Sequence, residues 1–186
     1  MALKATIHRA NISFSDLDLN RYGDHSLTIA RHPSETDERM MIRLLAFVLN
    51  APDTSDGGTL EFGKDLWEAD EPALYQKDLT GLMVHLIEVG QPEEKRITRV
   101  CSRSRRVSVY CFSATAEAWW AGMSGRMSRM SNLNVWQIPP DQSRALSELA
   151  DRSMNLNITI QEGTIWVEEG DQSVEVTPVR LLGGES

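Results

Sequence analysis

The sequence predicts an α/β protein in which a central region of alternating helices and strands carries an antiparallel β extension from both ends of the chain. Polar and apolar residues alternate with a period of two near both ends, which is typical of half-exposed strands. Between them, over residues 34–151, helical and strand patterns follow one another, which is typical of an α/β domain. The 186 residues are enough for one substantial core.

The amino-terminal part of the extension, residues 1–33, contains two predicted strands. Residues 2–14 alternate between apolar and polar side chains. A turn-like segment at residues 21–24 leads to a second strand through Leu27 and Ile29. This pattern predicts a hairpin of two long strands.

The carboxy-terminal part of the extension, residues 152–180, repeats the pattern. Glycine-containing turns separate three alternating segments, residues 156–160, 164–168 and 173–177. We expect all the terminal strands to pair in one antiparallel sheet. We expect the glycine-containing tail at residues 181–186 to be disordered.

The central region opens with a helix over residues 34–49. Ser34 is the expected N-cap, and Asp37 stands three residues later in the first turn, where a carboxylate suits the helix dipole. Apolar residues then recur at helical spacing, and a polar, glycine-containing loop follows at residues 53–58. The sequence therefore predicts a buried amphipathic helix at this position.

The following elements are separated by proline, glycine and aspartate signals. Pro92 suits the first position of a helix, Asp141 is an expected N-cap, and Thr80-Gly81 forms a turn. From residue 34 the predicted order begins with a helix, three strands, a helix and a strand. After the first helix these elements are strand 59–62, the strand before Asp78, strand 82–89, helix 92–105, strand 106–112, helix 115–127, strand 133–138 and helix 142–151.

Composition restricts the protein class. No segment is long and apolar enough for a membrane span, and no signal-peptide pattern appears. The two cysteines, Cys101 and Cys111, match no metal-binding spacing, so we expect free thiols in a reducing cytoplasm.

Charge is distributed unevenly along the chain, whose net charge is −8. Residues 53–94 contain eleven acids and two bases, whereas residues 95–129 contain eight bases and one acid. This switch of sign predicts either a cation site beside a phosphate-binding surface or two blocks that neutralise each other across the fold. Nucleic acid and protein partners both stay open.

Asp78 and Glu88 are the candidate metal ligands. Glu88 interrupts an apolar strand near its end, where a carboxylate is costly unless it is paired or coordinates a cation. Asp78 precedes the turn, so a hairpin with acids on both arms would bind a hard cation such as Mg²⁺ or Mn²⁺. The alternative is that the following helix caps Glu88.

Cationic residues follow Glu88 on the predicted helix. Arg96, Arg99 and Arg103 share one face at near-helical spacing, which suits bidentate contacts with phosphates or is simply a solvated face. Lys95 would stabilise a transition state at a scissile phosphate if it points towards Glu88. Glu38, in the first turns of the earlier helix, is a possible further metal ligand.

Several segments resemble the bacterial YaeQ family over essentially the whole chain. The most specific are residues 31–41 (RHPSETDERMM) and 87–97 (IEVGQPEEKRI). Residues 70–72, 119–120, 132–136 and 165–166 add to the match. The family's fold resembles that of PD-(D/E)XK nucleases, so the resemblance implies a restriction-endonuclease-like core, a helix, three strands, a helix and a strand, over residues 34–151.

The resemblance also implies a site and an activity. The nuclease pattern has an acid, then an acid, any residue and lysine; Asp78 and Glu88 match the acids, with Asp70 or Glu71 as rivals for the first. Gly90 stands at the lysine position, and Lys95 or Gln91 would have to replace that side chain. Two functions therefore stay open: metal-dependent hydrolysis of phosphodiesters by a nuclease-like protein, and non-catalytic binding of nucleic acid or protein.

Overall fold

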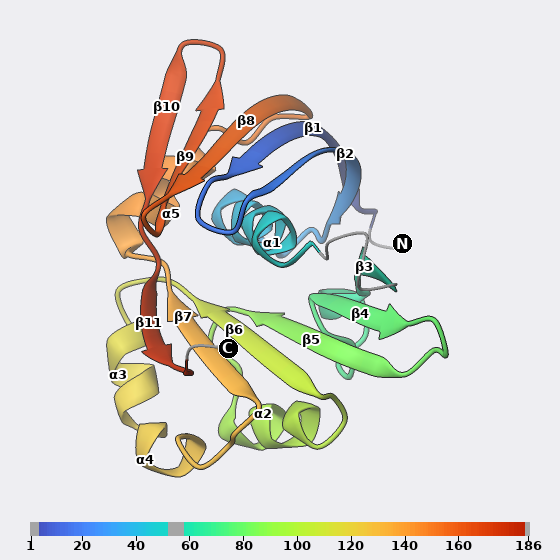
Figure 1. Cartoon of the computed structure of the whole chain (residues 1–186), viewed down its shortest axis with the longest axis vertical. Coiled ribbons are helices and arrows are strands. Elements are labelled where there is room, and N and C mark those ends of the chain that lie inside the picture. The colour runs from blue at the N-terminus through green and yellow to red at the C-terminus, as the bar shows by residue number, and fades with distance from the viewer. Residues whose placement is uncertain (1–3, 52–57, 185–186) are drawn as a thin grey trace. The chain divides into compact units, whose positions relative to one another are not determined.

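The chain folds into two compact units, seen in a computed structural model that describes residues 4–51 and 58–184. The first unit comprises Met1–Met41 and Pro139–Pro178, and the second comprises Ile42–Ile138 and Val179–Ser186. Each unit is built on one sheet (Figure 1). The protein therefore has a mixed α/β fold with two mixed sheets.

The first unit contains a five-stranded sheet made from both ends of the chain. Its strand order is β10-β9-β8-β1-β2. In chain order the strands are β1 (Thr6–Asp16), β2 (Arg21–Arg31), β8 (Ser153–Gln161), β9 (Thr164–Glu169) and β10 (Gln172–Val176). The predicted joint sheet is thus confirmed.

The prediction that this sheet is antiparallel throughout is wrong. β1 and β8 run parallel, with Ile12 opposite Leu156, whereas the other neighbours are antiparallel. Alternation in the sequence fixes which side chains share a face, and it carries no information on strand direction. One face is apolar and buried through Ala10, Ile12 and Phe14 of β1.

The helix α5 (Pro140–Ser147) belongs to the first unit. Asp141 is not its N-cap, as predicted, because Pro139 takes that position and Pro140 begins the helix. Gln142 instead accepts a hydrogen bond from the backbone N–H of Thr177, at 2.7 Å. The predicted central domain, residues 34–151, therefore differs from the second unit at both ends.

The second unit contains a six-stranded sheet of order β11-β7-β6-β5-β4-β3. β5, β6 and β7 are parallel, and the other neighbours are antiparallel. The strands are β3 (Gly58–Phe62), β4 (Leu74–Asp78), β5 (Met83–Val89), β6 (Arg106–Cys111), β7 (Leu133–Gln137) and β11 (Val179–Leu182). Leu181 and Leu182 thus lie in a strand rather than in the predicted tail, whose last two residues fall outside the described part.

Three helices connect the parallel strands, and all lie on one face of this sheet (Figure 1). They are α2 (Glu94–Cys101), α3 (Ala116–Ala121) and α4 (Ser124–Met127), and a 3-10 turn at Asp65–Trp67 precedes β4. Ile97, Val100 and Cys101 of α2 join the apolar cluster beneath them. The predicted helix 92–105 is shorter at both ends, and the predicted helix 115–127 is split in two.

The helix α1 (Asp37–Asn50) begins in the first unit and ends in the second. It starts three residues later than predicted, because Thr36 rather than Ser34 acts as the cap: Thr36 Oγ1 accepts from the N–H of Arg39 at 3.1 Å. Ser34 is engaged with the His32 ring instead, at 2.6 Å. The predicted loop at residues 53–58 lies almost wholly outside the described residues.

From α1 onward the order is a helix, three strands, a helix and a strand, as the sequence indicates. Within the described ranges, no helix is long and apolar enough to cross a membrane.

Candidate nucleic-acid interface

Glu88 is held by Arg96. Glu88 is the penultimate residue of β5 and has only 4% of its surface exposed. Arg96, in the first turns of α2, donates from Nε to Oε2 of Glu88 at 3.1 Å, and its Nη2 lies 3.0 Å from Oε1. An arginine of the next helix thus neutralises the charge of the carboxylate that the sequence predicts as a metal ligand. This matches the alternative expectation, that the helix after β5 caps Glu88.

Arg96 also reaches the segment that precedes β4. It donates to the carbonyl oxygen of Ala69, and from Nη2 to that of Glu71 at 2.8 Å. Arg99 binds the Asp70 side chain, with Nη1 2.5 Å from Oδ1. These contacts bring Asp70 and Glu71, the rivals for the first acid, to the end of β5 that carries Glu88.

Asp78 lies at the opposite end of β5. The register pairs Lys77 with Met83 at the turn and Leu74 with Ile87 near Glu88. At about 3.3 Å per residue, the strand separates Asp78 from Glu88 by roughly 17 Å, too far to share one ion. The structure therefore does not bring together the two acids of the predicted metal site.

The Asp78 carboxylate has a local role in the turn. Its Oδ1 accepts from Thr80 N at 2.8 Å, Thr80 Oγ1 at 2.6 Å and Leu82 N at 3.0 Å. The Thr80 hydroxyl above all, with these backbone N–H groups, holds the pKa of Asp78 below its usual value. Asp78 is thus an Asx-type turn residue.

The donor set does not fit a Mg²⁺ or Mn²⁺ ion in this arrangement. Among the residues that the structure describes, no group of three or more His, Cys, Asp or Glu side chains converges as a metal site. Glu38, the possible further ligand, lies in the first unit and accepts a hydrogen bond from Ser143 Oγ at 2.5 Å.

Neither substitute for the missing lysine points to Glu88. Lys95 is exposed and lines a shallow depression of about 560 Å³ along α2 with Glu94, Thr98, Arg99 and Ser102. Gln91 donates to Ser113 Oγ at 2.8 Å and to Thr115 Oγ1 at 2.9 Å, in the loop after β6. Gln91 is therefore engaged away from the carboxylate that it would have to assist, and Lys95 makes no ion pair among the described residues.

The predicted arginine row is not a set of equivalent cations. Arg96 and Arg99 are engaged by Glu88 and Asp70. Arg103 is exposed and lies beyond the end of α2. Of the three, only Arg103 has no ion-pair partner among the described residues.

A different cationic surface forms at the end of the sheet where β5, β6 and β7 begin. The β4–β5 turn, the α2–β6 loop and the α4–β7 loop all lie at this end of the sheet. Asn132 Nδ2 links the last two by donating to the carbonyl oxygens of Cys101 and Ser104, both at 2.9 Å. Five exposed cations belong to these segments and are called the basic edge below: Lys77, Arg103, Arg105, Arg106 and Arg129.

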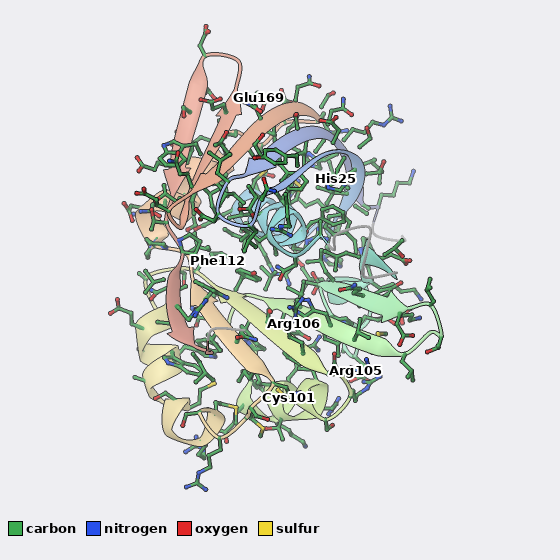
Figure 2. All side chains as sticks on the ribbon, in the orientation of Figure 1. His25, Cys101, Arg105, Arg106, Phe112 and Glu169 are labelled. Atoms are coloured by element: carbon green, nitrogen blue, oxygen red, sulfur yellow. The ribbon has the colours of Figure 1, made fainter. Side chains whose placement is uncertain are left out.

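The basic edge has one carboxylate, Asp78, in residues 77–82, 102–106 and 128–132. That carboxylate already accepts three hydrogen bonds within its turn. Figure 2 labels Arg105, in the loop before β6, and Arg106, the first residue of β6. No salt bridge involves a basic-edge side chain in the described ranges. Lys77 Nζ lies 5.3 Å from the centroid of the Tyr75 ring, whereas the charges of the four arginines are available to an anionic partner.

Arg106 has a second contact, with a buried histidine. His85 is 1% exposed, and Arg106 Nη2 lies 3.0 Å from its Nδ1. Because a guanidinium only donates, Nδ1 accepts and Nε2–H donates to Ser108 Oγ at 2.8 Å. Burial, with the Arg106 charge, lowers the pKa of His85 to about 3. His85 is thus a neutral structural histidine.

The two cysteines are free and buried. Burial raises the pKa of the Cys101 thiol to about 11 and that of Cys111 to about 12. Both therefore stay protonated and unreactive at neutral pH.

Sequence reasoning missed four of the five cations of the basic edge. For Arg105, Arg106 and Arg129 the signal was the basic block itself, eight bases in residues 95–129, whereas Lys77 lies in the acidic block. Helical periodicity favoured the residues on α2, whereas the cations of the basic edge lie in the loops after α2 and α4, at the start of β6 and at the end of β4. Which bases meet acids depends on tertiary contacts between α2 and residues 69–71.

Comparison with known proteins gives the chain's relationships. A family model described as YaeQ protein matches residues 1–178. The chain belongs to the YaeQ family. It is 42% identical over 178 residues to "Uncharacterized protein YaeQ" of Salmonella typhi and 41% identical to that of Escherichia coli (strain K12), each match covering 95% of both chains.

Solved YaeQ structures share the fold. The crystal structure of YaeQ protein from Xanthomonas axonopodis pv. citri matches with a TM-score of 0.90 and 40% identity, over 97% of this chain and 99% of that one. The YaeQ protein from Pseudomonas syringae matches with a TM-score of 0.89 and 33% identity, over 97% of each chain. The mixed α/β architecture is therefore that of the YaeQ family.

Proposed function

We propose that this protein binds nucleic acid through the basic edge and does not cleave it. This proposal rests on the basic edge, which has five exposed cations although the chain has a net charge of −8. Its segments contain one carboxylate, Asp78, which already accepts hydrogen bonds within its own turn. Such a local reversal of sign provides an electrostatic footprint for a phosphate backbone. Four of the cations are arginines, whose guanidinium forks match phosphate oxygens.

The arrangement at Glu88 supports the non-catalytic half of the proposal. Metal-dependent hydrolysis requires carboxylates that converge on an ion. Glu88 is instead compensated by Arg96, and Asp78 lies at the far end of β5. Gly90 supplies no side chain at the lysine position. The nuclease-like hypothesis stays as the alternative, and it requires that Arg96 release Glu88.

Salt-dependent binding tests the proposal. Anisotropy of a labelled DNA duplex, titrated at increasing salt, is expected to show affinity that falls steeply with salt concentration. Replacing Arg103, Arg105 and Arg129 by alanine is expected to flatten the slope of log K against log salt by about 0.9 for each lost contact.

A matched triple variant controls for net charge. Arg9, Arg144 and Arg152 are exposed cations of the first unit, and their replacement by alanine removes the same charge. This variant is expected to retain most of the wild-type slope. Absence of binding by the wild type at low salt, or equal losses in the two triple variants, would overturn the proposal.

Cleavage is tested separately. Mixed DNA and RNA substrates incubated with Mg²⁺ or Mn²⁺ are expected to remain intact, and calorimetry is expected to show no metal binding that depends on Glu88. Metal-dependent cleavage that disappears in Glu88→Ala would establish the nuclease-like alternative instead.

A further inference from the structure

Two leucines are displayed at the tip of the β4–β5 turn. Leu79 is 88% exposed and Leu82 is 57% exposed. A single exposed leucine is ordinary, but two on one five-residue turn form an apolar projection. Residues 79–82 include no charged side chain that would shield them.

The turn holds this projection in a defined conformation. Asp78 N donates to Leu82 O and Gly81 N donates to Asp78 O, both at 3.0 Å. Gly81 has a φ of +87°, a conformation that glycine adopts without strain. Together with the three hydrogen bonds to the Asp78 carboxylate, these contacts preorganise the tip, which reduces the entropy lost on binding.

The tip adjoins the basic edge. α2 runs antiparallel to the parallel strands, so its carboxyl end and the following loop return to the end of the sheet at which β5 and β6 begin (Figure 1). Lys77 directly precedes the turn. The charge of Arg105 contributes to lowering the pKa of Asp78 within the turn. The apolar projection therefore stands beside cations that would contact a phosphate backbone.

We infer that Leu79 and Leu82 form a wedge that enters between stacked base pairs of a DNA duplex held by the basic edge. This inference rests on the proposed function. Apolar side chains flanked by cations insert between base steps in this way, and the cost of unstacking is offset by the contacts that bent DNA allows. The leucines would exchange water for base faces.

The composition of the edge favours a duplex over a single strand. Binding of single strands commonly relies on aromatic side chains on which successive bases stack. Residues 77–82, 102–106 and 128–132 contain none. Pyrimidine–purine steps unstack most easily, so duplexes with a central TA step are the preferred ligands.

Base unstacking provides the readout. The probe is a DNA duplex with 2-aminopurine in place of adenine at a central TA step, saturated with wild-type protein at low salt. Its fluorescence is expected to rise on binding, because unstacking relieves quenching. In Leu79→Ser/Leu82→Ser the rise is expected to disappear and affinity to fall roughly tenfold, while the salt slope stays that of the wild type.

Leu19→Ser is the matched control, since Leu19 is 66% exposed and lies in the first unit. It is expected to behave as the wild type. A saturated wild-type complex without a fluorescence rise, or an undiminished rise in the double variant, would overturn the wedge and leave the proposed function standing. Absence of any binding would overturn the proposed function itself. If Leu79→Ser/Leu82→Ser weakened binding to phosphatidylserine vesicles but not binding to DNA, the tip would be assigned to a lipid surface instead.

Discussion

Arg96 and Glu88 form a compensated pair in which the arginine Nε lies 3.1 Å from Oε2 and Nη2 lies 3.0 Å from Oε1. The same guanidinium binds the carbonyl oxygens of Ala69 and Glu71. One side chain thus neutralises a buried acid and fixes the segment that leads into β4. This pair supports a structural role for Glu88.

Replacing Arg96 by alanine is expected to destabilise the protein by roughly 2–3 kcal/mol. The change leaves a carboxylate that is 4% exposed without its counter-ion and removes two bonds to backbone carbonyls. Urea unfolding followed by circular dichroism measures the difference. Arg99→Ala, which breaks the exposed pair with Asp70, is the control and is expected to cost less than about 1 kcal/mol. Equal costs for the two variants would contradict a structural role of the Arg96–Glu88 pair.

Arg103 and Arg99 are expected to differ in nucleic-acid binding. Asp70 holds Arg99, whereas Arg103 has no ion-pair partner among the described residues. Arg103→Ala should therefore lower the salt slope of DNA binding by about 0.9, and Arg99→Ala should change it little. Titrations of the single variants over a range of salt concentrations distinguish them. Equal effects would mean that the row on α2, rather than the basic edge, contacts phosphate.

His85 is expected to make stability dependent on pH between 6.5 and about 3. Its pKa in the folded protein is lowered to about 3 from 6.5, so the unfolded chain binds a proton in this range that the folded protein does not. Stability should then fall as pH decreases, by up to about 1.4 kcal/mol per pH unit from this residue. Urea unfolding of the wild type and of His85→Gln across this pH range measures the contribution of His85 to the pH dependence of the unfolding free energy. A variant with the wild-type pH slope would show that His85 is not buried in neutral form.

The sequence predicted the order of elements better than their arrangement. Alternation placed β1, β8 and β9 correctly as half-exposed strands, because burial of one face imposes a period of two. The parallel pairing of β1 with β8 could not be predicted, because strand direction produces no pattern in the sequence. The cap at Thr36 and the early end of α2 were missed, because adjacent residues offered equally good capping and helical signals.

The candidate site shows the same limit. Glu88 was correctly marked as a buried acid that needs compensation, since its place in an apolar strand is visible in the sequence. Its partner was not visible, because Arg96 looked like one member of an exposed row. Asp78 was chosen by its position in a hairpin, but strand direction places it at the far end from Glu88. Tertiary pairing, rather than spacing, decides which charges remain available.

Gly90 is expected to resist replacement although space surrounds it. A Cβ added there would meet no atom within 4 Å, yet the backbone φ is +108°, a conformation that side chains other than glycine rarely adopt. Gly90→Ala should therefore destabilise the protein by about 1–2 kcal/mol through backbone strain alone.

Gly125→Ala is the control. A Cβ added to Gly125 also meets no atom within 4 Å, and its φ is not positive. Because Gly125 lies within α4, its replacement should be neutral or stabilising. Urea unfolding of both variants makes the comparison. If Gly90→Ala is destabilised, Gly90→Lys, which restores the lysine of the nuclease pattern, would also distort the backbone beside Glu88. A Gly90→Ala variant as stable as the wild type would contradict this account, and the position could then accept a functional side chain.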